Sequence, residues 1–316
     1  MPVTGSAAKT ARPAPMGREA ASALQGGALA LLGILLGAHD GAAHLARTWA
    51  SSPTYHHGAI VPLISIGLIW MHWRPGDRPS GWSLALTGVA GAGAIYAAGS
   101  VLDARLLQHA GLAGMIAAGA AAVMGRALAT RHRFALLFLL LMVPFGESSV
   151  PSLQEVTARS IMASAALFGV PAIRDGLIIA TPAGDFEVAE ACAGLRFVIA
   201  SLVTGILCAH LFFTSRRKQG IMVFAAVLVP VAANALRASG IVLVAEATDL
   251  RVAAGADHLI YGWGFFALVT GAVVLAALRR ADPEAPRLPD PVPRFGANPL
   301  LVGAAAGGIG LLSGIA

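Results

Sequence analysis

Repeated apolar runs of about 20 residues, each long enough to cross a lipid bilayer as a helix, alternate with short polar segments along the chain. The polar segments are mostly too short for anything but a tight connection between antiparallel neighbours. We place eight spans on this pattern, at residues 22–39, 58–72, 82–100, 111–125, 134–146, 192–213, 220–246 and 258–278. A further apolar run at 298–316 predicts a ninth span. The predicted fold class is all-α, a polytopic transmembrane helix bundle.

One long polar connection, residues 147–191, precedes the sixth span. Its first part, GESSVPSLQEVTARSIMASAALFGV, has the apolar spacing of an amphipathic helix lying on the outer membrane surface. Farther on, Leu177–Ala180 and Phe186–Val188 flank the turn signal TPAGD, which predicts a short hairpin. The loop then delivers the chain to Cys192. It is interpreted either as an element that guides a substrate or as a plain connector.

The remaining segments complete the domain organisation. We divide the chain into a basic cytoplasmic tail at 1–21, a membrane domain at 22–280, a Pro-rich cytoplasmic linker at 281–297 and an additional helix at 298–316. No small-residue cleavage site follows the first span, so we expect that span to be retained rather than removed as a signal peptide. Since the last run is apolar to its end, we expect a truncated protein or a lost extracytoplasmic appendage.

Composition and charge support the membrane assignment and set an orientation. Hydrophobic residues make up 57% of the chain and charged residues only 12%, whereas about a quarter of the residues of a soluble domain are charged. The net charge is +6, but most Lys and Arg residues fall in the tail and in alternate loops. This positive-inside pattern places the N-terminus in the cytoplasm. The basic charge therefore reports topology, and we expect membrane lipids, not nucleic acid, around the chain.

The chain contains two cysteines, Cys192 and Cys208. They stand about 24 Å apart on one helix at 1.5 Å per residue, and a disulfide requires Cα atoms within about 7 Å. Cys208 fits a small apolar core residue. Cys192 is a lone thiol at the outer side, where unpaired cysteines are uncommon, so either a packing role or a chemical role stays open for it.

Two arginines accompany Cys192. Arg196 follows it at i+4, on the same helical face, where a guanidinium favours the thiolate form of a cysteine. Its alternative role is an interfacial arginine reaching toward lipid headgroups. Arg237 lies about 26 Å into the seventh span, at the level of Cys192, with Asn234 one turn earlier as a hydrogen-bond partner. A charged residue within a span is a functional candidate.

The alternative to a functional Arg237 is a structural salt bridge, for which Glu190 and Glu246 are the candidate partners. Glu190 also stands two residues before Cys192, which makes it a candidate supporting or substrate-binding residue.

His258 begins the eighth span, again at the outer side, and Tyr261 follows it. Both residues suit an aromatic belt at the membrane interface. However, three spans then place a thiol, a guanidinium and an imidazole at one membrane depth. This set suits acyl transfer, with Cys192 as nucleophile, His258 as proton shuttle and Arg237 stabilising negative charge. His57 enters the second span from outside and is a candidate for binding substrate or a lipid headgroup. We find no clustered metal ligands and expect no cofactor.

The motifs VAEACAGLR, ANALRASGIV and GADHLIYGWGFF occur in an order and spacing that resemble the exosortase/archaeosortase family. SSPTYHHG and VPFGESSVPSLQEVTA resemble the exosortase A type, and the resemblance covers residues 21–280. It implies a polytopic inner-membrane cysteine transpeptidase with its active site facing the periplasm. The family's Cys, Arg and His positions correspond to Cys192, Arg237 and His258.

The resemblance also implies a partner class. The family acts on exported proteins that carry a C-terminal PEP-CTERM signal: a Pro-Glu-Pro motif, a transmembrane helix and a basic tail. In this context Arg196 is expected to bind the glutamate of that motif or to support the thiolate. Two other classes remain possible, a transporter or non-proteolytic component of extracellular polysaccharide export, and a non-catalytic membrane scaffold.

Overall fold

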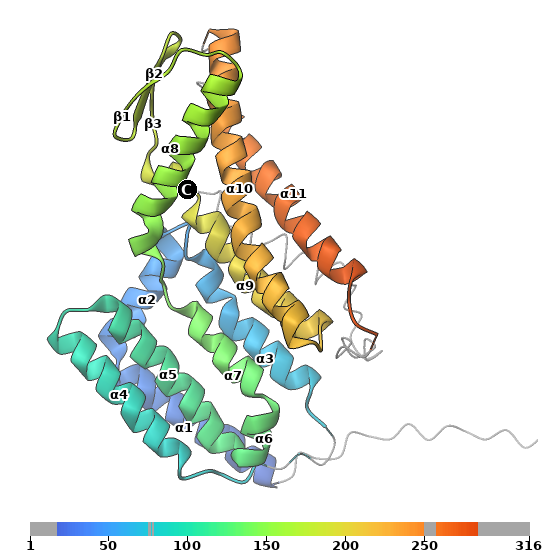
Figure 1. The fold of residues 1–316 in the computed structure, drawn as a ribbon. Coiled ribbons are helices and arrows are strands. Elements are labelled where there is room, and N and C mark those ends of the chain that lie inside the picture. Colours follow the sequence, from blue (N-terminus) through green and yellow to red (C-terminus); the bar gives the residue numbers. More distant parts are fainter. Residues whose placement is uncertain (1–17, 75–76, 78, 250–256, 284–316) are drawn as a thin grey trace, which may run out of the picture.

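A computed structural model describes residues 18–74, 77, 79–249 and 257–283, with backbone alone for 18–24 and 257–263. The chain is mostly helical, and most of its helices run alongside one another in a bundle (Figure 1). The predicted helical class is therefore confirmed. The predicted ninth span, most of the linker and most of the basic tail lie outside the described residues.

The N-terminal part contains a sharp bend that the sequence pattern did not predict. Its elements are α1 (Arg18–Gly37), α2 (His39–Ser51), the 3-10 helix η1 (His56–Ala59) and α3 (Val61–Met71). Residues Gln25–Gly37 of α1 meet α2 at 90°. The segment of α2 mixes His, Asp and Arg with alanines, so it gives no long apolar run, and its helix is visible only in the structure.

Helices α4 and α5 form a tight antiparallel hairpin because glycines line their contact. The next elements are α4 (Ala85–Val101), α5 (Arg105–Met124), α6 (Arg126–Arg131), α7 (Arg133–Phe138) and η2 (Leu139–Met142). A Cβ atom on Gly111 would lie 2.5 Å from the backbone nitrogen of Tyr96, so only glycine allows this approach. The predicted fifth span is divided between α7 and η2, and α5 begins six residues before the predicted fourth span.

The long loop before the sixth predicted span folds into a helix and a small sheet. It comprises η3 (Glu147–Ser149), α8 (Val150–Leu167), β1 (Ile173–Asp175), β2 (Ile178–Thr181) and β3 (Gly184–Glu187). The strands form an antiparallel sheet in the order β1-β2-β3. The sequence predicted only the β2–β3 hairpin, because β1 is three residues long and too short to show alternation.

The C-terminal part carries the longest helix of the described residues. It comprises η4 (Glu190–Cys192), α9 (Leu195–Phe212), α10 (Arg216–Thr248) and α11 (Asp257–Arg279). The 33 residues of α10 extend about 50 Å, more than the hydrocarbon thickness of about 30 Å. Helices α9 and α10 approach closely at Gly205, where a Cβ atom would lie 2.2 Å from the Cβ of Ala226.

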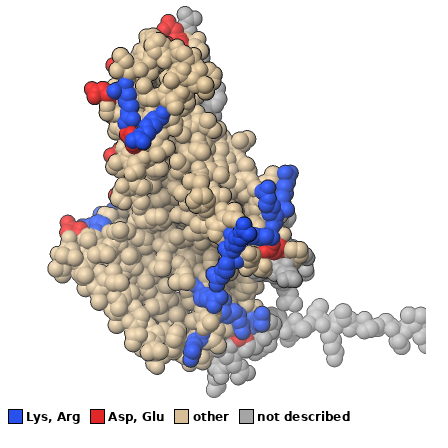
Figure 2. All heavy atoms as spheres, viewed as in Figure 1, with Lys and Arg blue, Asp and Glu red and all other residues tan. Residues whose placement is uncertain are grey.

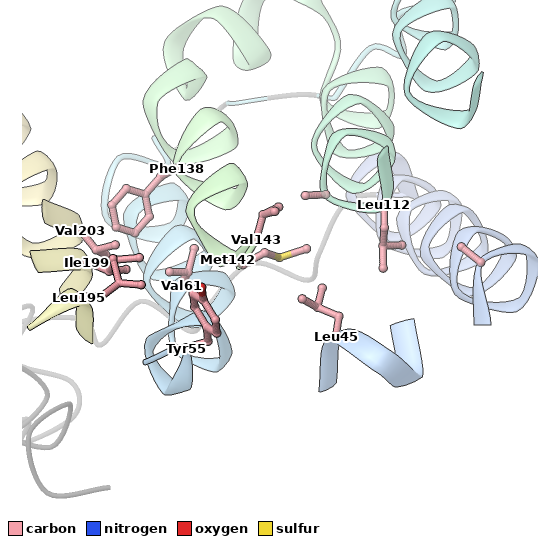
Figure 3. Close-up of a cluster of buried hydrophobic side chains, with 12 residues drawn as sticks. Leu45, Tyr55, Val61, Leu112, Phe138, Met142, Val143, Leu195, Ile199 and Val203 are labelled. Atoms are coloured by element: carbon pink, nitrogen blue, oxygen red, sulfur yellow. The ribbon is translucent and has the colours of Figure 1, made fainter. Parts of the chain in front are cut away.

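The largest hydrophobic core joins the N-terminal helices to the start of α9. Figure 3 shows Leu195, Ile199 and Val203 of α9 near Phe138 and Val61, with Leu112 and Leu45 farther along the cluster. This packing fixes the helix that directly follows η4.

Membrane-spanning length is reached by three of the described helical segments, Arg105–Met124, Glu190–Phe212 and Arg216–Thr248. Two bent helix pairs raise the number to five, and the remaining apolar helices are shorter. These segments bear out a membrane protein, while the count of eight spans stays a prediction.

Figure 2 shows Lys and Arg gathering in a band over the ends of α6, α10 and α11. The exposed basic residues at these helix ends are Arg126, Arg131, Arg216, Arg217, Lys218 and Arg279.

Candidate active site

Cys192 lies at the end of η4, and Ala193 and Gly194 separate it from the start of α9. The prediction that Cys192 and Arg196 share one face of a continuous helix is therefore wrong. Its side chain is partly buried, whereas Cys208 is 5% exposed inside a second apolar cluster, and both thiols are free. Gly194 caps α9 with a left-handed φ of 81°. A Cβ atom there would also lie 2.6 Å from Cγ of Asn234. Glycine therefore makes the tight turn that carries the chain from the cysteine into the helix.

Two buried amide side chains hold the backbone at Cys192 and at Val188, four residues before it. Asn234 of α10, which is 3% exposed, donates from Nδ2 to the Cys192 carbonyl oxygen at 2.8 Å. The same nitrogen lies 3.3 Å from Oγ1 of Thr157 on α8. Gln154, one turn before Thr157, donates to the Val188 carbonyl oxygen at 2.8 Å. The cysteine loop is thus held between α8 and α10. The sequence offered Asn234 as a partner for Arg237, but gave no signal for Gln154 or Thr157.

Arg196 and Arg237 converge on one aromatic ring. The guanidinium carbon of Arg196 lies 4.9 Å from the Phe197 ring centre, and that of Arg237 lies 6.0 Å from it. Arg196 follows Cys192 by four residues, and Arg237 follows Asn234, the donor to Cys192, by three residues on α10. The Nε atom of Arg196 is buried and has no hydrogen-bond partner among the described residues. The structure therefore brings together the thiol and both predicted arginines.

Glu190 and Glu246, the candidate salt-bridge partners of Arg237, lie in different parts of the structure. Glu190 is exposed on η4, beside the cysteine. Glu246, near the end of α10, accepts hydrogen bonds at 3.0 Å from Thr181 Oγ1 and from the Ala183 backbone N–H. Glu246 thereby attaches the β2–β3 turn to α10.

His258 and Tyr261 lie in the first two turns of α11, but their side chains are outside the described part of the structure. Helix α11 packs against both α9 and α10. Phe197 of α9 stacks on Phe266 of α11 with ring centres 4.7 Å apart. The Phe197 ring, over which both guanidiniums lie, therefore also contacts α11, the helix whose first turn includes His258.

His57 lies in η1 and is 4% exposed. Its Nδ1 atom is 3.2 Å from the Thr54 carbonyl oxygen, within its own turn.

Nearby, the Tyr55 hydroxyl lies 3.3 Å from the Glu147 carboxylate and 3.1 Å from the Phe145 carbonyl oxygen. Burial and the adjacent Glu147 carboxylate raise the pKa of Tyr55, so its phenol stays protonated. This group was not singled out from the sequence.

The described residues contain no group of three or more His, Cys, Asp or Glu side chains that could hold a metal ion. What they bring together is a thiol, two guanidiniums and a fixed backbone turn at the start of a helix. A thiolate stabilised by cations is a nucleophile, and guanidiniums also stabilise an oxyanion. The arrangement suits attack on a carbonyl group.

Comparison with known proteins identifies the family. A family model described as transmembrane exosortase matches residues 49–275, which include η4 and helices α3 to α10. Neither the curated proteins nor the solved structures give a match to this chain. The family resemblance read from the sequence motifs is confirmed, whereas the A type stays a prediction.

Proposed function

Because this chain belongs to the transmembrane exosortase family, we propose that it is a membrane-embedded cysteine transpeptidase that cleaves the C-terminal PEP-CTERM signal of exported proteins. The observation that carries the proposal is that Asn234 of α10 holds the Cys192 loop next to Arg196 and Arg237, whose guanidiniums both lie over the Phe197 ring. A lone packing cysteine does not need two arginines on neighbouring helices beside it, whereas a cysteine that reacts as a thiolate is favoured by them.

The chemistry proceeds in two acyl-transfer steps. In the first, the Cys192 thiolate attacks the carbonyl carbon of the scissile peptide bond, and Arg237 stabilises the negative charge on the carbonyl oxygen. His258 gives a proton to the departing nitrogen as the C–N bond breaks. The exported part of the substrate is then held as a thioester, and the signal helix with its basic tail is released.

In the second step an acceptor with a hydroxyl or amine group attacks the thioester carbonyl. His258 takes the proton of that nucleophile, the C–S bond breaks, and the Cys192 thiolate is restored. Arg196 supports the thiolate in both steps. In this proposal Cys192 supplies the nucleophile, His258 transfers the protons and the arginines stabilise negative charge, so no step uses a metal ion or an organic cofactor.

The proposed setting is the bacterial inner membrane, with the active site at the periplasmic face. It is supported by the exposed Lys and Arg residues at one end of the bundle (Figure 2) and by the predicted positive-inside pattern. Asn234, the contact of Cys192, lies 18 residues after Arg216 at the start of α10. At 1.5 Å per residue this is about 27 Å, close to the far side of the hydrocarbon layer.

The proposal is tested by processing of a PEP-CTERM substrate in membranes that contain Cys192→Ala or Cys208→Ala protein. The two variants remove the same atom from cysteines that are both near or on α9. Cys192→Ala is expected to abolish processing, and Cys208→Ala to retain it. Normal processing by Cys192→Ala would exclude the proposed thioester mechanism.

A further inference from the structure

Strand β3 has one open edge. It pairs with β2 on one side, and the strand order β1-β2-β3 leaves its other side without a neighbouring strand in the described structure. The Val188 backbone N–H donates to the Leu177 carbonyl at 2.9 Å, and the register continues with Ile178 opposite Glu187. Hydrogen-bonded and non-bonded pairs alternate in an antiparallel ladder. The backbone groups of Glu187, and those of Asp185 two residues earlier, therefore point away from β2.

Strand β3 is attached to the bundle through its inner face and at both ends. Ile179 is fully buried and packs in one apolar cluster with Ala158 and Ile161 of α8 and Val242 of α10, and Phe186 packs against the same cluster. The β2–β3 turn is attached to α10 through Glu246, and the end of β3 is attached to α8 through Gln154. A strand fixed at both ends offers its free N–H and C=O groups at little further cost in conformational entropy.

The edge also leads directly to the nucleophile. Only four residues separate Glu187, at the end of β3, from Cys192. In Figure 1 the chain runs from the sheet, beside the upper part of α8 and α10, down into the bundle where α9 begins. An extended peptide that pairs with β3 is thereby directed toward the thiol.

We propose that the open edge of β3 binds the extended segment of the substrate that lies on the N-terminal side of the cleaved bond, by adding it to the sheet as a fourth strand. This inference rests on the proposed function. The substrate chain approaches from outside and enters the membrane after its cleavage motif, so it runs in the same direction as β3 and pairs with it in parallel. Addition of an extended peptide to a sheet edge is an established mode of recognition.

The charge at this edge sets a preference among substrate segments. Asp185 and Glu187 are both exposed and, being two residues apart, lie on the same face of the strand. Lys or Arg in the added segment gains a cross-strand partner there, and Asp or Glu meets a like charge. The same acidic pair disfavours aggregation of the open edge with copies of itself.

The test uses synthetic substrates whose backbone N–H groups are replaced one at a time by N-methyl groups along the segment before the cleaved bond. Cleavage is followed with the full-length protein in detergent. In a parallel pair alternate residues of the added strand donate to β3. We expect kcat/KM to fall about tenfold at alternate positions and to change less than about twofold between them. A decline without this two-residue period would overturn the inference.

Variants of the protein give a second, independent measurement. Asp185→Pro and Glu187→Pro remove an outward N–H without breaking the β2–β3 ladder, and Asp185→Ala and Glu187→Ala keep that N–H while removing the charge. The proline variants are expected to raise KM several-fold over their alanine counterparts. Equal KM values for proline and alanine variants would contradict edge pairing.

Two readouts separate the possible failures. Alkylation of Cys192 and thermal unfolding report whether each proline variant has kept its fold, and the N-methyl substrates, assayed on the unaltered protein, do not depend on that. If the unaltered protein cleaves the parent substrate in a Cys192-dependent way but the N-methyl scan has no two-residue period, only the edge inference fails. If no Cys192-dependent cleavage occurs, the proposed function itself fails.

Discussion

The Cys192 carbonyl oxygen receives its hydrogen bond from Asn234, and this single contact joins the nucleophile's backbone to the helix that also carries Arg237. Asn234 and Arg237 are three residues apart and therefore lie on neighbouring parts of one helical face. Because one helix positions both the cysteine loop and the arginine, small movements of α10 carry the two groups together. Among single residues, Asn234 positions the backbone of Cys192, and Arg196 stabilises the proposed thiolate through its charge.

Asn234→Ala is predicted to impair positioning of Cys192. It leaves the Cys192 carbonyl without its donor, at a cost of about 1–3 kcal/mol. We expect kcat to fall at least tenfold, with a smaller change in KM, because the nucleophile is misplaced while substrate binding surfaces remain. Steady-state kinetics of processing measure both constants.

The matched control for Asn234 is Ser239→Ala, on the same helix. Ser239 is 4% exposed, and its hydroxyl has no hydrogen-bond partner among the described residues. Its loss is expected to leave kcat within about twofold, since the hydroxyl makes no hydrogen bond to the described residues. Equal losses in the two variants would show that Asn234 matters only as a buried polar group on α10.

Arg196→Gln is predicted to reduce the reactivity of Cys192. Removing one of two nearby cations makes the thiolate less favourable, so alkylation by a neutral maleimide at pH 7 should slow about threefold or more. The measurement uses Cys208→Ala protein, in which Cys192 is the remaining thiol. Arg159→Gln is the control, because the Arg159 side chain is 75% exposed on α8 and pairs with Glu155. An unchanged rate in Arg196→Gln would remove the proposed role of Arg196.

At the scale of elements, the turn between η4 and α9 depends on Gly194. Gly194→Ala is predicted to disrupt it, because an L-residue is strained at a φ of 81° and its Cβ would meet the Asn234 side chain. We expect loss of processing and a lower melting temperature. Gly240→Ala in α10, where a Cβ meets nothing within 4 Å, should retain both properties. Wild-type turnover in Gly194→Ala would show that the turn does not position the cysteine.

Helices that contain a long apolar run could be predicted from the sequence. The thiol and the charged residues in or beside these runs could also be identified, because such groups are rare in apolar segments. This covers α9 and α10, together with Cys192, Arg196 and Arg237. Helix α2 is amphipathic but contains no long apolar run, and strand β1 is only three residues long, so a search for apolar runs misses both. Gln154 and Thr157 on α8 look like ordinary surface residues, since their role comes only from the packing of α8 against α10.

Across the whole molecule, opposite ends of the bundle must face opposite compartments if Cys192 acts on exported proteins. The orientation is tested with protein that carries Cys192→Ala and Cys208→Ala. A single cysteine is then introduced as Asp185→Cys on β3 or as Arg217→Cys on α10. A membrane-impermeant maleimide should label Asp185→Cys in intact spheroplasts, and Arg217→Cys only after the membrane is opened. The positive-inside pattern is the physical basis of this expectation. The reverse labelling would place the active site in the cytoplasm.

In the proposed reaction Cys192 carries the substrate as a thioester. The most direct measurement is mass spectrometry of the protein rapidly denatured in acid during turnover of a PEP-CTERM substrate, because thioesters survive acid and are cleaved by hydroxylamine. We predict a hydroxylamine-sensitive adduct on the peptide that contains Cys192, with the mass of the exported part of the substrate. It should be absent from Cys192→Ala and present in Cys208→Ala. Turnover of the substrate by Cys192→Ala, or an adduct confined to another residue, would contradict the account.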